Sequence, residues 1–227
     1  MMGQVFLRHC DIVFWVDSCG ARVDAHSLAT QTATLLSDIR QAIEKEWGIR
    51  WRLRFAWHPE KSRVTPTIRF SEDYSGPVFS DARLLQPCPD WESELVTLLA
   101  TIPVTGEGEG LHESAWSYGA SRHIVFASVP LACPPSLGHL SLLTELARAK
   151  VRPLVVGEEE TPLCTLPGAT QFCVTPTNCD ITALRRDIAL EMLGDARQHL
   201  TPAGSLLGVW LPNDWMIADS LKAIGLR

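Results

Sequence analysis

Several features that often reveal what a protein does are missing from this chain. No apolar run reaches the roughly 18 residues of a membrane span, and the N-terminal stretch MMGQVFLRHCD lacks the apolar core of a secretory signal. Lys and Arg form no cluster and the formal net charge is −6, which argues against binding to a phosphate backbone. We therefore expect a cytoplasmic protein that binds neither membranes nor nucleic acids.

Familiar metal, disulfide and phosphate motifs are missing as well. The seven Cys residues are scattered and contain no CxxC pair, which is typical of small buried side chains in a reducing compartment. An HExxH motif is excluded because Trp116 stands four residues after His112. The Gly-rich segment TGEGEG at 105–110 lacks the Lys of a P-loop, and its two Glu would repel phosphate, so we interpret it as a solvated turn.

The chain does contain alternating strand and helix patterns. Hydrophobic residues make up 46% and charged residues 20%, as in a soluble globular protein. Short apolar or alternating runs predict strands, and apolar residues at helical spacing predict helices. The expected strands are 12–16, 51–57, 66–70, 123–130, 151–157 and 170–175, and the expected helices are 24–47, 90–102, 111–120, 134–150, 180–193 and 213–225.

This order predicts an α/β fold: a doubly wound, Rossmann-like, mainly parallel sheet with helices on both faces. One antiparallel edge strand is expected, because 66–70 could form a hairpin with 51–57. The alternation in 51–57 places Arg52 and Arg54 on a wetter face. Pro153 places the strand 151–157 nearer an edge, or itself at the start of that strand. We expect one domain over 1–194 and a helical extension over 195–227 that docks on it, although its Trp210 and Trp215 could instead face a partner.

Ligands of parallel sheets bind beyond the carboxyl ends of the strands, where the strand order reverses. Asp17 directly follows the apolar run of residues 12–16, and Ser128 lies at the end of a later strand. The same edge is expected to receive the Gly-rich loop with Gly108 and Glu109. Asp17 could hold a metal, take part in chemistry, or accept hydrogen bonds from the amides of the following turn.

The ordered set of segments resembles the von Willebrand factor type A (vWA) domain family over roughly residues 10–194. The stretch VDSCGAR aligns without gaps to the D-x-S-x-S metal-ion-dependent adhesion site of that family. WRLRFAWHPE is similar to the second strand of the family, HIVFASVPLACPP to its fourth strand, and QFCVTPTNCDITALRRDI to its closing strand and helix. The resemblance implies a protein-binding surface at the top of the sheet, and in bacterial members a signalling context.

The departures from the family pattern fall on the metal ligands. Cys19 and Ala21 stand where the family has serines, Ser128 stands where it has Asp, and Gly108 or Glu109 stands near its Thr. Hard cations require oxygen ligands, so Asp17 would be the main metal ligand left, and Mg²⁺ would be held weakly if at all. We expect a degenerate adhesion site and no other cofactor.

Two functions remain open from the sequence. The first is a non-enzymatic module that binds another protein through Asp17, Ser18, Cys19, Gly108, Glu109 and Ser128 without a tightly held metal. The alternative is a cysteine-dependent α/β hydrolase or transferase, in which Cys19 near a helix N-terminus is the nucleophile. Its base would come from His26, His58, His112 or His123.

Overall fold

A computed structural model describes most of the chain. The described residues are 6–16, 25–47, 50–57, 68–72, 91–104, 112–117, 119–127, 138–157, 168–173, 180–198 and 222. Within them, strands and helices alternate in the order β1 (Phe6–Val16), α1 (Ala25–Trp47), β2 (Arg50–Trp57), α2 (Trp91–Thr101), β3 (Ser121–Ala127), α3 (Gly138–Ala149), β4 (Val151–Gly157), β5 (Thr170–Cys173) and α4 (Ile181–Gln198).

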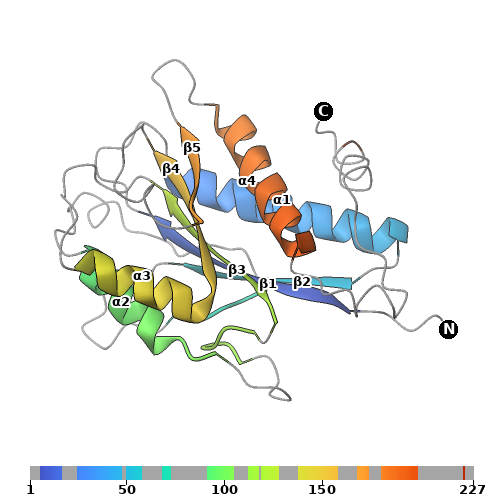
Figure 1. Ribbon diagram of the computed structural model, residues 1–227. Helices are drawn as coiled ribbons and strands as arrows, with labels where there is room; N and C mark the ends of the chain where they lie inside the picture. The colour runs from blue at the N-terminus through green and yellow to red at the C-terminus, as the bar shows by residue number, and fades with distance from the viewer. Residues whose placement is uncertain are drawn as a thin grey trace.

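The five strands form one sheet in the order β2-β1-β3-β4-β5, and every neighbouring pair is parallel (Figure 1). From β1 the chain adds β2 on one side and then crosses back to place β3 on the other. The order therefore reverses between β1 and β3, which is the switch point of a doubly wound sheet. The predicted α/β class and its parallel sheet are confirmed.

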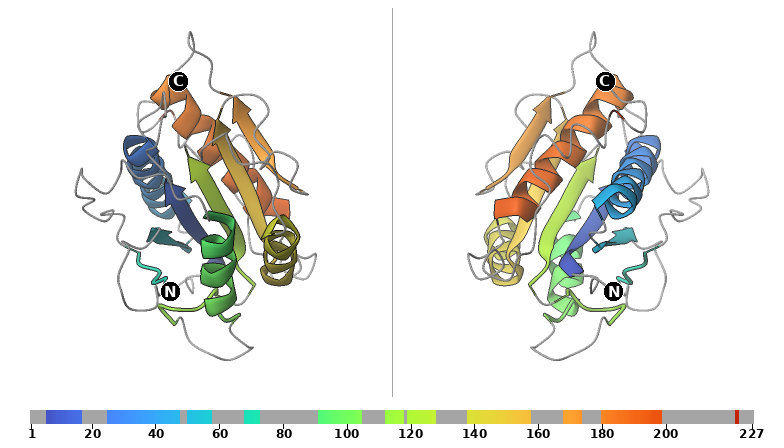
Figure 2. Two further views of the ribbon diagram at one scale, coloured as in Figure 1. Left: turned by 90° about the vertical axis from the view of Figure 1, so that its left-hand side faces the viewer. Right: turned by 90° about the vertical axis from the view of Figure 1, so that its right-hand side faces the viewer.

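Helices cover both faces of the sheet (Figure 2). One face packs against α1 and α4 in a core that contains Ile12, Phe14 and Phe55 from the strands with Leu36 and Ile188 from the helices. This packing follows from the sequence: alternate strand residues point to one face, and α1 carries its Leu and Ile residues at helical spacing.

The opposite face packs against α2 and α3. Its core contains Trp15, Ile124 and Phe126 from the strands, together with Leu98 and Leu142 from the helices. The connections at 68–70 and 112–117 also take part in this core, because they contribute Ile68, Phe70 and Trp116.

The predicted antiparallel edge strand does not form within the described residues. Near 66–70 there is a single antiparallel bridge, in which Phe55 and Ser71 exchange backbone hydrogen bonds of 2.7 and 2.8 Å. The amide of Phe70 donates instead to the carbonyl of Glu113, at 2.6 Å. The alternation of this segment arises because Ile68 and Phe70 pack into the core, not because it pairs along β2.

The predicted helix at 111–120 is wrong for its described residues, which form turns. Backbone groups that a helix would use are bound to side chains of the sheet: the carbonyls of His112 and Ala115 accept from Arg54, and the amide of Ser117 donates to Asp11. Gly119, at φ +62°, adopts a left-handed conformation that ends any helical turn.

Two further expectations concern β4 and the C-terminal region. β4 is the second strand from one edge of the sheet, between β3 and β5. Pro153 lies near the start of β4, before the pairing with β5 begins at Leu154. α4 continues to Gln198, past the boundary expected at 194. Lys222 is helical, while Trp210 and Trp215 lie outside the described residues.

Candidate functional site

The candidate site is the switch point of the sheet, at the carboxyl ends of β1 and β3. Val16 and Ala127 are the last residues of these strands, and they are register partners in the sheet. After them the chain leaves to opposite faces, because α1 packs on one side of the sheet and α3 on the other (Figure 2). In doubly wound sheets, ligands bind where the chain diverges in this way at the carboxyl ends of neighbouring strands.

The predicted site residues themselves lie outside the described part of the chain. This applies to Asp17, Ser18, Cys19, Gly108, Glu109 and Ser128, and also to Ala21. For Asp17 and Ser128, however, the preceding residues are paired neighbours on adjacent strands, which lie about 4.8 Å apart in a sheet. The fold therefore delivers the chain to positions 17 and 128 from adjacent points on one edge.

Gly108 and Glu109 are approached from a different direction. The described residues flanking them, Val104 and His112, belong to the connection from the C-terminal end of α2 to the start of β3. In a parallel sheet such a connection joins the strands at their amino ends, and β3 begins at Ser121 opposite Cys10, well before the end of β1. The described residues thus do not bring this loop together with the 17–19 and 128 positions.

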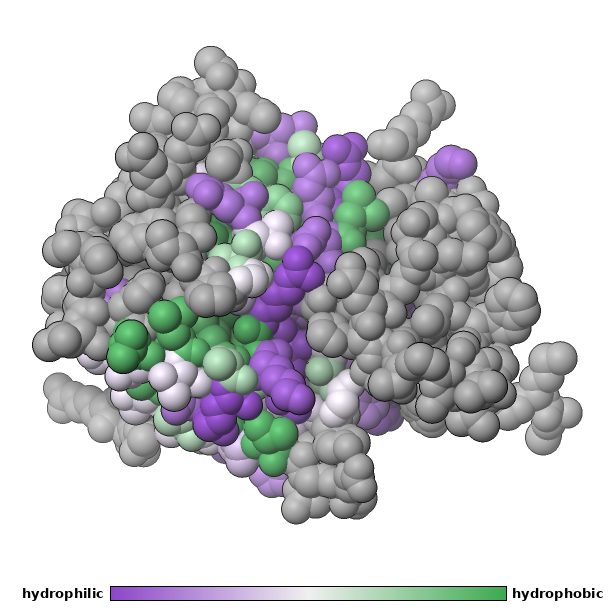
Figure 3. All heavy atoms as spheres, in the orientation of Figure 1, coloured by the Kyte–Doolittle hydropathy of each residue, from purple (hydrophilic) through white to green (hydrophobic). Residues whose placement is uncertain are grey.

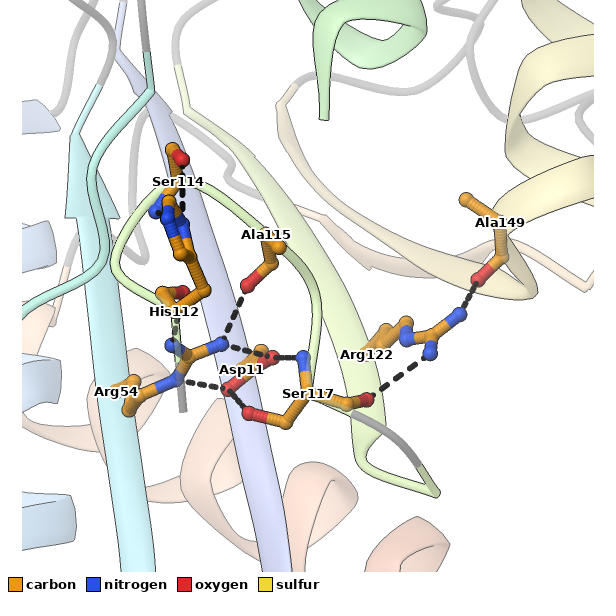
Figure 4. Close-up of polar contacts among 8 residues, drawn as sticks. All are labelled: Asp11, Arg54, His112, Ser114, Ala115, Ser117, Arg122 and Ala149. Carbon is orange, nitrogen blue, oxygen red and sulfur yellow. Dashed lines mark hydrogen bonds and ion pairs between the residues drawn. The ribbon is translucent and has the colours of Figure 1, made fainter. Parts of the chain in front are cut away.

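A buried charge network lies at the amino-terminal half of the sheet. The guanidinium of Arg54 binds both carboxylate oxygens of Asp11, with Nε–Oδ1 and Nη2–Oδ2 distances of 2.8 Å. Ser117 donates to the same carboxylate from its amide at 2.6 Å and from its hydroxyl at 3.2 Å. Asp11 is fully buried and Arg54 is 3% exposed. Figure 4 shows the carboxylate enclosed between the two partners.

The same network holds the connection 112–117 against the sheet. Arg54 donates to the carbonyls of His112 and Ala115, at 2.9 and 2.7 Å. Arg122 donates to the carbonyls of Ser117 and Ala149, which links the connection to the end of α3. Burial lowers the pKa of Arg122, while Asp11 opposes this change; the guanidinium nevertheless stays charged at neutral pH.

These contacts make the Asp11 network a structural anchor. All four hydrogen bonds to its carboxylate come from protein donors, which leaves it poorly suited to ligate a metal or a substrate. Val16, the last residue of β1, lies five residues beyond Asp11, or about 17 Å away at the rise of a strand. The network therefore supports the fold from the far end of the sheet.

The sequence reading missed this anchor. Alternation correctly placed Arg52 and Arg54 on one face of β2, but the prediction that this face is wetter is wrong for Arg54. The guanidinium carbon of Arg54 lies 4.7 Å from the ring centroid of Phe70. The available signal was Asp11 itself, a carboxylate next to an apolar strand run, which requires a buried cationic partner.

The described histidines do not supply an obvious base for cysteine chemistry. His123 is fully buried, with Nε2 2.7 Å from the hydroxyl of Ser121. The Nδ1 atom of His112 lies 2.7 Å from the hydroxyl of Ser114 within a turn. His58 and the side chain of His26 lie outside the described residues.

His9, on β1, makes the stability of the fold depend on pH. Burial lowers the pKa of His9 below its usual 6.5, and Arg52 and Arg54 lower it further, against the opposing effects of Asp11 and Glu72. The folded state thus binds the proton less readily than the unfolded chain. The stabilisation that comes from keeping His9 neutral is fully present above the pKa of His9 in the unfolded chain, about 6.5. It is lost as the pH falls below that value.

When the pH is lowered from neutral to below about 6, the free energy of unfolding should fall less for His9→Gln than for the native chain. The measurement is urea unfolding across this range. His112→Gln makes the same exchange at an exposed position and is the control. An unchanged pH profile for His9→Gln would contradict this assignment.

Sequence similarity assigns this chain to no family. Neither protein-family models nor curated proteins give a significant match to the chain. Among the described residues, no group of three or more His, Cys, Asp or Glu could hold a metal ion. No helix within those residues is long and apolar enough to cross a bilayer.

Proposed function

We propose that this chain is a non-enzymatic protein-binding domain of vWA-like type. It binds a partner protein at the carboxyl edge of the sheet, around Asp17, Ser18, Cys19 and Ser128, without a tightly held metal. The bacterial signalling context implied by the resemblance is part of this proposal.

The observation that supports it best is the pairing of Val16 with Ala127 at the switch point. Two loops that leave adjacent strand ends and continue to opposite faces form a natural recognition surface. The parallel sheet and the antiparallel bridge of Ser71 beside β2 are consistent with the resemblance. With Cys19, Ala21 and Ser128 in place of oxygen-rich ligands, recognition would depend on shape and polar contacts and not on a shared cation.

Charge reversal tests this proposal. A partner is first isolated with the native chain, and its affinity is then measured for Asp17→Lys and for Asp38→Lys. The second variant makes the same charge change on an exposed position of α1. We expect Asp17→Lys to weaken binding at least tenfold, which is about 1.4 kcal/mol, and Asp38→Lys to leave it unchanged.

Two additions make the outcome specific. EDTA should not alter the affinity for the partner. A third variant, Glu109→Lys, tests separately whether the loop between α2 and β3 takes part in binding. Native affinity in Asp17→Lys, or loss of binding in EDTA, would refute the proposed surface or its independence from metal. Rapid, selective alkylation of Cys19 at mildly acidic pH would instead favour the hydrolase or transferase alternative.

A further inference from the structure

Helix α3 is apolar beyond what its own packing requires. Leu142, Leu146 and Ala149 are buried in the core. Leu140, Leu143 and Ala147 form a second row at spacings of three and four residues, which we call the α3 stripe. Leu140 is 75% exposed, Ala147 is exposed and Leu143 is half-buried. Leu143 also packs against the core, whereas Leu140 and Ala147 add exposed apolar surface.

The α3 stripe borders a shallow hollow of about 460 Å³, which Leu146, Val151, Thr144 and Lys150 also line. Figure 3 shows hydrophobic side chains gathered over α3. From Leu140 to Lys150 the surface extends about 15 Å at the helical rise. Because Leu140, Thr144 and Ala147 are exposed, the hollow cannot enclose most of a small molecule, as ligand pockets do. A flat, elongated element of a protein fits it better.

The charge at one end of the hollow selects among such elements. Lys150 is exposed, and its ammonium makes no hydrogen bond or ion pair with the described residues. The neighbouring Arg148 is already bound to Glu145 and to the carbonyl of Leu99. The hollow therefore offers apolar contact along its length and an unpaired positive charge at the C-terminal end of α3.

We propose that the α3 stripe binds an amphipathic helix of a partner protein, antiparallel to α3, with carboxylates in its first turn against Lys150. Apolar residues at i, i+3 and i+7 of that helix would pack on the α3 stripe. Acidic residues in a first turn also stabilise their own helix. None of the residues that line this surface belongs to the 17–19 and 128 positions, and the inference does not rest on the proposed function.

A second copy of the chain fits less well. An antiparallel α3 would bring its own first turn to Lys150, but that turn contains no acidic residue. A parallel α3 would place two Lys150 side chains next to each other. Both arrangements leave the positive charge unpaired.

The probe is a synthetic amphipathic helix of about three turns, with leucines at i, i+3 and i+7 and glutamates in its first turn. Fluorescence anisotropy with the full chain should give a dissociation constant on the order of 10–100 µM, as small interfaces do. Leu140→Ser should weaken binding at least tenfold. Leu190→Ser, at a 39% exposed position of α4, is the matched control and should bind as the native chain does.

A charge exchange tests the orientation. Lys150→Glu should bind the acidic peptide several-fold more weakly, and a peptide with lysines in its first turn should recover that loss. Native affinity in Leu140→Ser, or no recovery with the lysine peptide, would overturn the proposal. Sedimentation that shows a dimer dissociated by Leu140→Ser, or binding of the native chain to anionic vesicles through Leu140, would also overturn it in favour of another occupant.

Discussion

Asp11→Ala should destabilise the fold by about 3–5 kcal/mol, the usual cost of removing one partner from a buried ion pair. Arg54 would stay 3% exposed with its charge uncompensated, and Ser117 would lose both hydrogen bonds that hold the 112–117 connection to β1. For a chain of this size, a loss of that magnitude lowers the melting temperature by about 10 °C.

Urea unfolding measures this loss, and two variants make it specific. Glu72→Ala removes a partner of Arg52 in an ion pair that is 3.4 Å long and partly exposed, so it should cost less than about 1 kcal/mol. Replacing Asp11 by Leu together with Arg54 by Met should recover much of the stability, because no buried charge is left unpaired. A loss below about 1 kcal/mol for Asp11→Ala would contradict the anchor.

Trp116→Ala is expected to cost about 3–5 kcal/mol, as large-to-small changes in a core do. Trp116 is fully buried, with its ring centroid 5.0 Å from that of Phe70 and 5.9 Å from the guanidinium carbon of Arg122. Its removal would leave a cavity between the 112–117 connection and the sheet.

Thermal and urea unfolding again provide the measurement. Val104→Ala is the matched control, because Val104 pairs with Trp116 in a backbone bridge but its side chain is 41% exposed. That variant should change the stability by less than about 0.5 kcal/mol. If the two variants unfolded alike, the role of the indole in this core would be refuted.

The sheet and its main helices were predictable because each carries its own periodicity. The apolar run of residues 12–16 and the helical spacing of Leu28, Leu36 and Ile39 identify β1 and α1 without reference to the rest of the chain. The parallel arrangement then follows from the alternation of the elements, whereas the strand order is known only from the structure.

The anchor could not be predicted in the same way, because its partners are far apart in sequence. Arg54 is 43 residues from Asp11, and Ser117 is 106 residues from it. Alternation shows which face a side chain takes but not what covers that face. The false helix at 111–120 has the same origin, since distant side chains bind the backbone groups that a local helix would use.

The candidate site is partly predictable for a topological reason. Residues that follow two adjacent strand ends meet at one edge, and the pairing of Val16 with Ala127 brings the chain there. Gly108 and Glu109 were expected at the same edge, but the connection that contains them leads into β3 at the amino end of the sheet.

Site-specific photo-crosslinking in the presence of EDTA tests the central claim most directly. A photoreactive phenylalanine derivative is placed at Ser18 in one variant and at the exposed Asp38 of α1 in another. We expect a covalent adduct with the partner protein from position 18 and none from position 38. Adducts from position 38 alone, or an adduct at position 18 that needs a divalent cation, would contradict it.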